Sequence, residues 1–248
     1  MKSFKILLLT ALLCASLCAC QNGGSKTGSS EKATAPSEII TTAPPTDPPT
    51  GSMVVAGREK EFVYNDGDNN GETITYKLPM LNFQTEDAKK INEEIGELYD
   101  ECFTTAEQEY ADNKSLSCES LGYESYLNDD IITLLISKEE DHALTYSVFN
   151  YNKTTGKRLD NAGLLEYLKL DAEQTYSALK TQLEDDYYSK FKYENFPDDY
   201  YYQLEMTVGD EALTQSKLFL NREAELFAIC TEYASVGKGE FQVMIAIP

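Results

Sequence analysis

The sequence predicts an α+β fold for residues 53–248, in which antiparallel sheets pack against two long helices and a short one. Three observations indicate this fold. Apolar side chains alternate over residues 73–78, as they do in a strand with one buried face. Residues 88–102 carry apolar side chains at steps of three and four, which is typical of one face of a helix. The run 131–136 is apolar on both faces, as expected of a central strand.

The other elements are justified in the same way along the chain. Thr85 precedes the first long helix, whose first turn is acidic, and Asp160 suits the cap of a short helix at 161–168. Gly156 can take the left-handed conformation that a hairpin loop needs. A second long helix is expected at 171–190. The remaining segments have the pattern of strands: 58–65, 116–127, 131–137, 143–151, 216–220, 225–230 and 240–247.

The start of the chain forms a separate segment. Lys2 and Lys5 make it basic, and the apolar run 6–17 is shorter than a membrane span, which needs about 20 residues. Small residues and then Cys20 follow. This pattern resembles the signal peptide of bacterial lipoproteins. The resemblance implies that residues 1–19 are removed and that Cys20 carries a lipid on the outer face of the cell membrane. An ordinary secretory signal or a short membrane anchor is the alternative.

Residues 20–52 are expected to form a disordered stalk that holds the folded part away from the membrane. They are rich in Thr, Pro, Ser and Gly and contain few large apolar side chains, so they cannot bury enough surface to offset the entropy of ordering. The proline pairs at 44–45 and 48–49 favour an extended chain. The module that follows is expected to have an N-terminal half, 53–158, and a C-terminal half, 159–248.

The charge of the chain is strongly one-sided. It contains 21 Lys and Arg residues against 42 Asp and Glu, which gives a formal net charge of −21 at pH 7. A phosphate backbone would be repelled, so nucleic-acid binding is argued against. A basic protein, a cationic peptide or metal ions would be attracted. Solubility alone is an equally simple reason for the acidity.

A family resemblance rests on short stretches spread over most of residues 53–248. They are 76–79 and 91–95, then 149–152 and 155–159 leading into 164–165, and finally 225–227, 232–234, 237, 239 and 245–248. Together they resemble the extracellular module of RsiV-type anti-sigma factors and the N-terminal part of PdaC-type peptidoglycan deacetylases. The resemblance implies a receptor-like module that binds lysozyme, a basic protein. Residues 140–143 lack the glycines that this family commonly has there.

The resemblance does not imply an enzyme. In PdaC-type proteins the metal-binding His and Asp residues belong to a catalytic domain beyond the module, and His142 is the single histidine of this sequence. The sequence also lacks the cytoplasmic signalling segment and transmembrane helix of RsiV-type proteins. We therefore expect a non-enzymatic module without a cofactor, a catalytic residue or a metal site.

Two local patterns could nevertheless bind a divalent ion. Residues 66–71 have the beginning of an EF-hand-like loop, but Lys77 occupies the position where a bidentate Glu is required, so a polar turn is favoured. Residues 139–142 contain three acids and His142, but consecutive side chains rarely converge on one ion, which favours a solvated loop. A cell-envelope glycan hydrolase that uses paired carboxylates is the alternative enzyme class, since so acidic a chain offers many pairs.

The most distinctive part of the module is the tyrosine-rich and acidic segment 187–202. Tyrosines give rigid amphipathic contact area, and neighbouring acids suit the Lys and Arg of a partner. The candidate partner-binding residues are Tyr193, Asp198, Asp199, Tyr200 and Tyr201. The alternative is that half of these rings only seal a helix against a sheet.

Three cysteines remain in the module after Cys20 is set aside, namely Cys102, Cys118 and Cys230. A bridge between Cys102 and Cys118 would stabilise by about 3 kcal/mol, and whether it forms is left open. The sequence as a whole predicts a surface-tethered lipoprotein that binds a lysozyme-like basic protein or a cell-wall component such as peptidoglycan.

Overall fold

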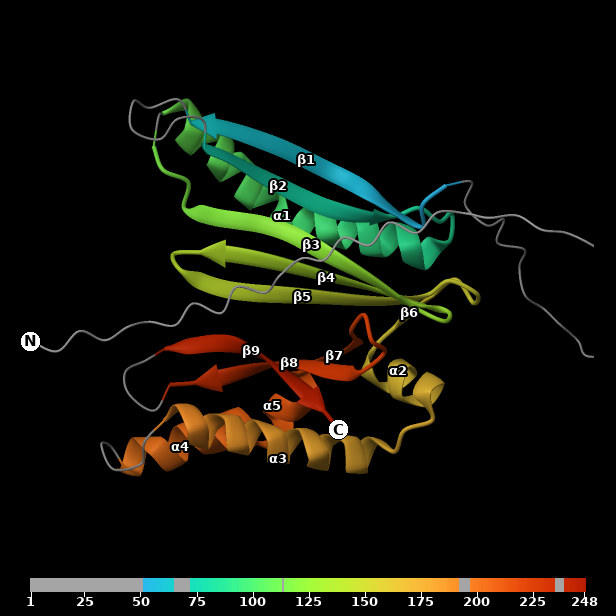
Figure 1. Ribbon diagram of the computed structural model, residues 1–248, viewed down its shortest axis with the longest axis vertical. Helices are drawn as coiled ribbons and strands as arrows, with labels where there is room; N and C mark the ends of the chain where they lie inside the picture. Colours follow the sequence, from blue (N-terminus) through green and yellow to red (C-terminus); the bar gives the residue numbers. More distant parts are fainter. Residues whose placement is uncertain (1–50, 65–71, 113, 192–196, 235–238) are drawn as a thin grey trace, which may run out of the picture. The chain divides into compact units, whose positions relative to one another are not determined.

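A computed structural model describes residues 51–248 apart from 65–71, 113, 192–196 and 235–238 (Figure 1). Cys20, the expected signal peptide, most of the expected stalk and the EF-hand-like residues 66–71 lie outside the described residues. Of the helices in the described part, none has both the length and the apolar character needed to cross a membrane.

The described elements confirm an α+β fold with antiparallel strands in three sheets. The sheets have the strand orders β1-β2, β3-β4-β5-β6 and β7-β8-β9. The strands are β1 (Val54–Tyr64), β2 (Glu72–Leu81), β3 (Cys118–Asn128), β4 (Ile131–Glu140), β5 (Ala143–Asn152), β6 (Lys157–Leu159), β7 (Lys217–Leu220), β8 (Leu226–Tyr233) and β9 (Glu240–Ile247). The helices are α1 (Glu86–Ala111), α2 (Asn161–Leu168), α3 (Ala172–Lys190), α4 (Pro197–Val208) and α5 (Asp210–Gln215).

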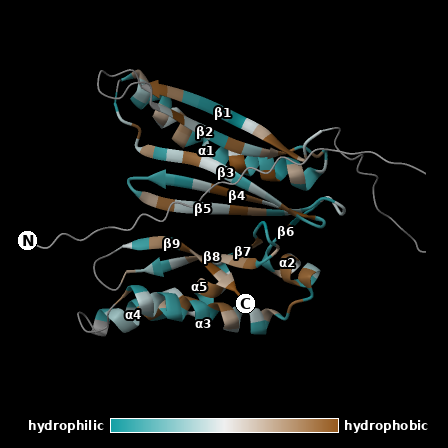
Figure 2. Ribbon diagram, in the orientation of Figure 1, coloured by the Kyte–Doolittle hydropathy of each residue, from teal (hydrophilic) through white to brown (hydrophobic). Residues whose placement is uncertain are grey.

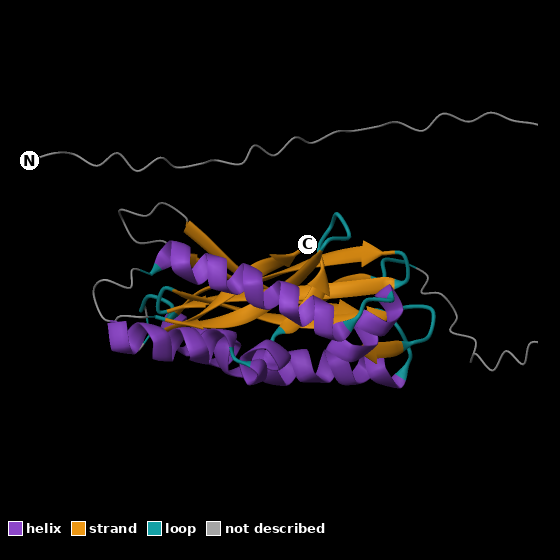
Figure 3. Cartoon of the chain, turned by 90° about the horizontal axis from the view of Figure 1, so that it is seen from below, coloured by secondary structure: helices purple, strands orange, loops and turns teal. Residues whose placement is uncertain are grey.

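The N-terminal half places α1 against the strands β1 to β5. The helix begins where the sequence predicts, and Thr85 is its cap, since the Thr85 hydroxyl accepts a hydrogen bond from the Ala88 N–H over 3.3 Å. Ile91, Ile95 and Phe103 of α1 are almost fully buried in one apolar core with residues of these strands. Figure 3 shows that the long helices run lengthwise along the strands. The apolar face of the first long helix is therefore buried against the sheets, as the sequence predicts.

Strand β4 is buried on both faces, as predicted for residues 131–136. Ile132, Leu134 and Ile136 belong to the core that α1 covers. Leu135 points to the opposite face and packs with Phe219 and Ile229 of the sheet β7–β9. Alternate side chains of one strand thus join two cores, which explains why its sequence is apolar without alternation.

The C-terminal half packs the helices α2 to α5 against β7, β8 and β9 in a second large core. Asp160 and Asp171 cap α2 and α3, accepting hydrogen bonds from the N–H groups of Gly163 (2.8 Å) and Gln174 (2.9 Å). Gly156 has a φ of 69°, as expected for the loop between β5 and β6.

Two helices were not predicted. Helices α4 and α5 occupy a region whose sequence is rich in tyrosine at its start and predicts no regular structure. Three successive tyrosines have a high strand propensity, and this hides the helical spacing of Tyr200 and Leu204. Both residues are buried in the C-terminal core, whereas α3 and α4 are mostly hydrophilic in Figure 2.

Candidate functional site

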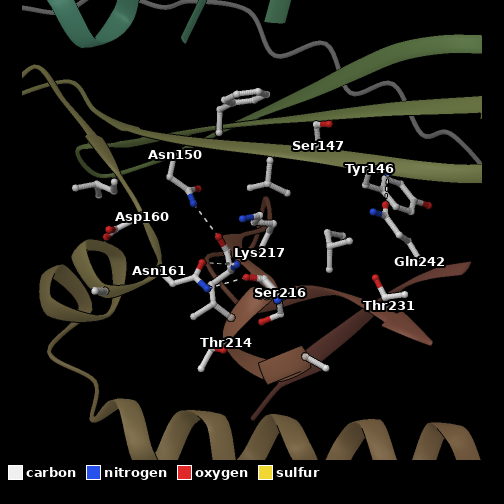
Figure 4. Close-up of a pocket in the computed structure, with 18 of the residues that line it drawn as sticks. Tyr146, Ser147, Asn150, Asp160, Asn161, Thr214, Ser216, Lys217, Thr231 and Gln242 are labelled. Atoms are coloured by element: carbon white, nitrogen blue, oxygen red, sulfur yellow. Dashed lines mark hydrogen bonds between the residues drawn. The ribbon is translucent and has the colours of Figure 1, made fainter. Parts of the chain in front are cut away.

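A groove of about 660 Å³ lies where the outer edge of β5 faces the sheet β7–β9. Its lining combines hydroxyl, amide and tyrosine side chains from elements far apart in the sequence (Figure 4). The polar residues that line it include Tyr146, Ser147, Asn150, Asn161, Tyr176, Thr214, Thr231, Tyr233 and Gln242.

Two asparagines fix one end of the groove. The Asn150 side chain donates to the Leu218 carbonyl over 2.7 Å and accepts from the Thr133 hydroxyl over 2.8 Å. The Asn161 side chain accepts from the Leu218 N–H over 3.0 Å and donates to the Ser216 carbonyl over 2.7 Å. Since each amide uses both its oxygen and its nitrogen, the start of β7 is held against β5 and α2 (Figure 4).

At the other end, Gln242 of β9 reaches β5. Its side-chain oxygen accepts a hydrogen bond from the main-chain N–H of Tyr146. On the side of α1, the Tyr99 hydroxyl donates to the Ser147 hydroxyl over 2.8 Å. Thr231 and Tyr233 of β8 add further hydroxyls to the lining. The groove therefore combines amides that hold its walls together with hydroxyls that can form hydrogen bonds with a polar ligand.

The charged residues of the groove differ in their pairing. Arg158 forms a two-pronged ion pair with Glu94, and its guanidinium lies 5.4 Å from the ring centre of Phe149. Asp160 is occupied as the cap of α2. Lys217 is exposed and forms no ion pair with any residue that the structure describes. Lys217 is thus the uncompensated charge in the lining.

The five candidate partner-binding residues differ in their exposure to solvent. Tyr193 and the side chain of Asp198 lie outside the described residues. Tyr200 is 3% exposed and its ring packs edge-on against Tyr187, so it seals the core, as the alternative proposed. Tyr201 is 61% exposed and Asp199 is also exposed.

The structure adds three residues to this helical surface that the candidate set omitted. Tyr202 is 61% exposed, Tyr188 of α3 is 53% exposed and Met206 is 41% exposed. The rings of Tyr188 and Tyr200 stack with their centres 6.3 Å apart, which supports the exposed ring from below. Helical spacing from the buried Tyr200 would have identified Tyr202 as exposed, had α4 been recognised.

A glycan hydrolase would need a pair of carboxylates, and one close pair in the structure has a member with a raised pKa. Lys190 lies between Glu232 and Asp186, with a distance of 2.9 Å from its Nζ to the Glu232 Oε2. Burial raises the pKa of Glu232 to about 7, although Lys190 opposes this. The side chain of Glu232 is 0% exposed, so a glycan has no access to it. This geometry argues against Glu232 as a catalytic acid.

His142 lies in the tight turn between β4 and β5. Asp141 and His142 have positive φ values of 51° and 65°, the region that glycine adopts most easily. Glycines at these positions, which are common in the RsiV-type and PdaC-type modules, would suit this turn. The exposed His142 ring contacts Glu119, with 2.7 Å between Nδ1 and Oε1. The described residues contain no group of three or more His, Cys, Asp or Glu side chains that could hold a metal ion.

The three described cysteines are all free thiols and all buried. Cys102 of α1 and Cys118 of β3 belong to the same apolar core, where the Cys118 thiol donates to the Ser120 carbonyl over 3.5 Å. The interaction with Cys118 lowers the pKa of Cys102 to about 7, while Cys102 and burial raise the pKa of Cys118. Cys230 lies in the C-terminal core, where burial raises its pKa to about 12.

The fold and these sites define an α+β module with a polar groove and a separate acidic, tyrosine-bearing helical surface. No protein-family model matches the chain, and no curated protein matches it. The function is therefore argued from the chemistry of the two surfaces.

Proposed function

We propose that this protein is a surface-tethered, non-enzymatic binding module whose α3–α4 surface binds a basic protein of the lysozyme kind. The observation that carries this proposal is the exposure of Tyr188, Tyr201 and Tyr202 among acidic side chains. Such rings bury a large area at a small loss of conformational entropy, and they are enriched in the centres of protein interfaces.

The charges around these rings support a basic partner. Asp185 of α3, Asp199 and Glu205 of α4 and Asp210 of α5 are all exposed. Helix α4 contains no Lys or Arg. A cationic partner would be steered to this surface and would place its Lys and Arg side chains between the rings.

The proposal is tested by titrating residues 43–248, which contain all the described helices and strands, with c-type lysozyme in a calorimeter. Cytochrome c is the control, because it is also strongly basic. We expect stoichiometric binding of lysozyme that persists at physiological salt, and weak binding of cytochrome c that salt abolishes. Equal, salt-sensitive binding of both proteins would contradict the proposal. The acidic charge would then be explained by solubility alone.

A second measurement locates the contact. Replacing Tyr201 and Tyr202 by Ala is expected to raise the Kd at least about tenfold, the effect of losing a well-packed interface residue. Asp199→Asn with Glu205→Gln is expected to slow association. Glu97→Gln with Glu101→Gln on α1 removes the same charge from another exposed surface and is the matched control. If the two charge pairs behave alike, the α4 surface is not the contact.

The tethering part of the proposal rests on the signal-like segment that ends at Cys20. Expression of the full chain in a bacterium fed with an alkyne-bearing fatty acid should label the protein, and Cys20→Ser should abolish the label. Labelling that survives Cys20→Ser would contradict lipidation at this residue.

A further inference from the structure

The outer edge of β5 is a second place where the molecule can bind a partner. Strand β5 pairs with β4 along its whole length, from Ala143 to Asn152. On its other side, β6 pairs only with Asn150, Tyr151 and Asn152. Among the described residues, the stretch 143–149 therefore has no strand on this side.

The register identifies which main-chain groups of β5 point outward. Asn150 and Asn152 pair with Leu159 and Lys157 of β6, and the Gly156 N–H donates to the Asn152 carbonyl at the end of this hairpin. Because the direction of main-chain groups alternates along a strand, Leu144, Tyr146 and Val148 point their N–H and C=O groups to the same side as Asn150. The bond from the Tyr146 N–H to Gln242 shows this direction directly.

The open edge of β5 forms part of the wall of the groove. Tyr146 and Val148 line the cavity of about 660 Å³, and Leu144 continues the edge beyond it. The Gln242 amide oxygen takes the place at the Tyr146 N–H that the carbonyl of a neighbouring strand would take. The N–H of Val148 has no hydrogen bond to any residue that the structure describes.

The line of β6 shows where another strand would lie. Strand β6 ends at Leu159, and the chain then turns away into α2. An extended chain placed beyond Leu159 would lie opposite Val148, Tyr146 and Leu144, and its carbonyl would replace the Gln242 side chain at the Tyr146 N–H. Its groups would repeat about every 7 Å, which is the spacing of the outward-pointing groups on β5. This repeat matches a polypeptide, whose main chain alone can satisfy the edge.

The charges of the groove indicate one further feature of such a peptide. Lys217 lacks an ion-pair partner among the described residues, whereas Arg158 is paired with Glu94. Lys217 precedes Leu218, whose carbonyl receives the Asn150 amide, so it lies near the β6 end of the open edge. A carboxylate at that end of the peptide would complement it.

We propose that this groove binds an extended peptide, which adds as a strand to the β5 edge in line with β6 and places a carboxylate near Lys217. This site is independent of the α3–α4 surface, so either can exist without the other.

The test uses residues 43–248 labelled with ¹⁵N and a defined probe, a heptapeptide that starts with Glu and continues with alternating Val and Thr, acetylated at its N-terminus and amidated at its C-terminus. A peptide that runs on in the direction of β6 places its first residue at the Lys217 end of the edge. We expect amide shifts at Leu144, Tyr146 and Val148, together with slower hydrogen exchange of the Val148 N–H. Two further probes carry N-methyl groups on either the odd or the even peptide amides. One of them should lose binding and the other should keep it, since only alternate amides face β5.

Variants of the protein give an independent control. Leu144→Pro removes an outward N–H at an edge position that tolerates proline and should weaken binding, whereas Leu144→Ala keeps the N–H and should not. Lys217→Gln should weaken the probe that starts with Glu about two- to fivefold and leave the same probe with Gln at its first position unchanged. Equal binding of both N-methylated probes, no binding of the parent peptide at millimolar concentration, or binding of a chitin oligosaccharide in its place would overturn the proposal.

Discussion

Asn150 of β5 donates its side-chain amide to the carbonyl of Leu218 in β7 over 2.7 Å, across 68 positions of sequence. Asn150 is 4% exposed and Leu218 is 0% exposed, so water cannot replace this bond. The same amide accepts from the hydroxyl of Thr133, which is also fully buried. One side chain thus satisfies polar groups of β4 and β7 in the contact between two sheets.

Replacing Asn150 by Ala is expected to destabilise the module by about 2 to 4 kcal/mol, because it leaves the Leu218 carbonyl and the Thr133 hydroxyl unsatisfied in the core. Urea unfolding of residues 43–248 measures this. Asn128→Ala is the control: Asn128 also bonds across the sequence, to the Asn221 carbonyl over 2.8 Å, but it is more exposed. Asn128→Ala should lower the free energy of unfolding by about 1 kcal/mol. An equal decrease in both variants would contradict the argument from burial.

The stability of the module should fall as the pH rises through neutrality. Burial raises the pKa of Glu232 from 4.5 to about 7, so the folded state holds this proton more tightly than the unfolded state. The stabilisation is complete below the unfolded pKa and is lost as the pH rises through the folded pKa, with a total of about 3 kcal/mol. Lys190 stays charged, because its contacts with Asp186 and Glu232 outweigh the lowering of its pKa by burial.

The variant Glu232→Gln isolates this effect, since an amide does not titrate. Urea unfolding at several pH values between about 5 and 8 should show a steeper loss of stability in the natural protein than in the variant. Parallel pH profiles of the two proteins would show that Glu232 is not the responsible group.

The elements that could be predicted from the sequence are those with local signals. Asp160 caps its helix as predicted, and the helix predicted at 171–190 begins at Ala172 with Asp171 as its cap. Such starts are predictable because a cap is a contact between near neighbours. The two buried faces of β4 were also predicted, since six successive positions have the pattern. Helix α4 was missed because its tyrosines favour strands when read alone.

The groove could not be predicted, for a different physical reason. It depends on Asn150, Asn161 and Gln242 meeting β5 and β7 from distant parts of the chain. No short pattern marks an asparagine whose partner lies 68 residues away. The tyrosine-rich surface was partly predictable, but only the helix decides that Tyr200 is buried while Tyr201 and Tyr202 are exposed.

Gly209, between α4 and α5, should not tolerate a side chain. A Cβ atom there would lie 2.8 Å from the Glu205 carbonyl oxygen, which is main chain and is fixed by accepting the Gly209 N–H over 2.9 Å. Gly209→Ala is therefore expected to lower the free energy of unfolding by about 1 to 3 kcal/mol. Gly122→Ala is the matched control, since nothing lies within 4 Å of its Cβ position. Thermal unfolding of both variants decides the matter, and equal melting temperatures would refute the steric argument.

The contact between Cys102 and Cys118 should make this pair the first to oxidise. In the folded state the interaction with Cys118 lowers the pKa of Cys102 to about 7, and Cys102 is 8% exposed, so a thiolate can form near neutral pH while the two cysteines stay close together. With glutathione disulfide, the Cys102 thiolate displaces one glutathione, and Cys118 then displaces the second. The two cysteines lose two hydrogens, and two molecules of glutathione form.

Intact mass spectrometry should then show a loss of about 2 Da, and alkylation after denaturation should find Cys230 alone as a thiol among the three. The closed loop should stabilise the module by about 3 kcal/mol, which thermal unfolding with and without a reductant measures. Cys230→Ala should behave like the natural protein, whereas Cys118→Ala should gain no stability from the oxidant. A mixed disulfide of glutathione with Cys230 as the main product would instead show that access, and not the thiol contact, decides which cysteine reacts.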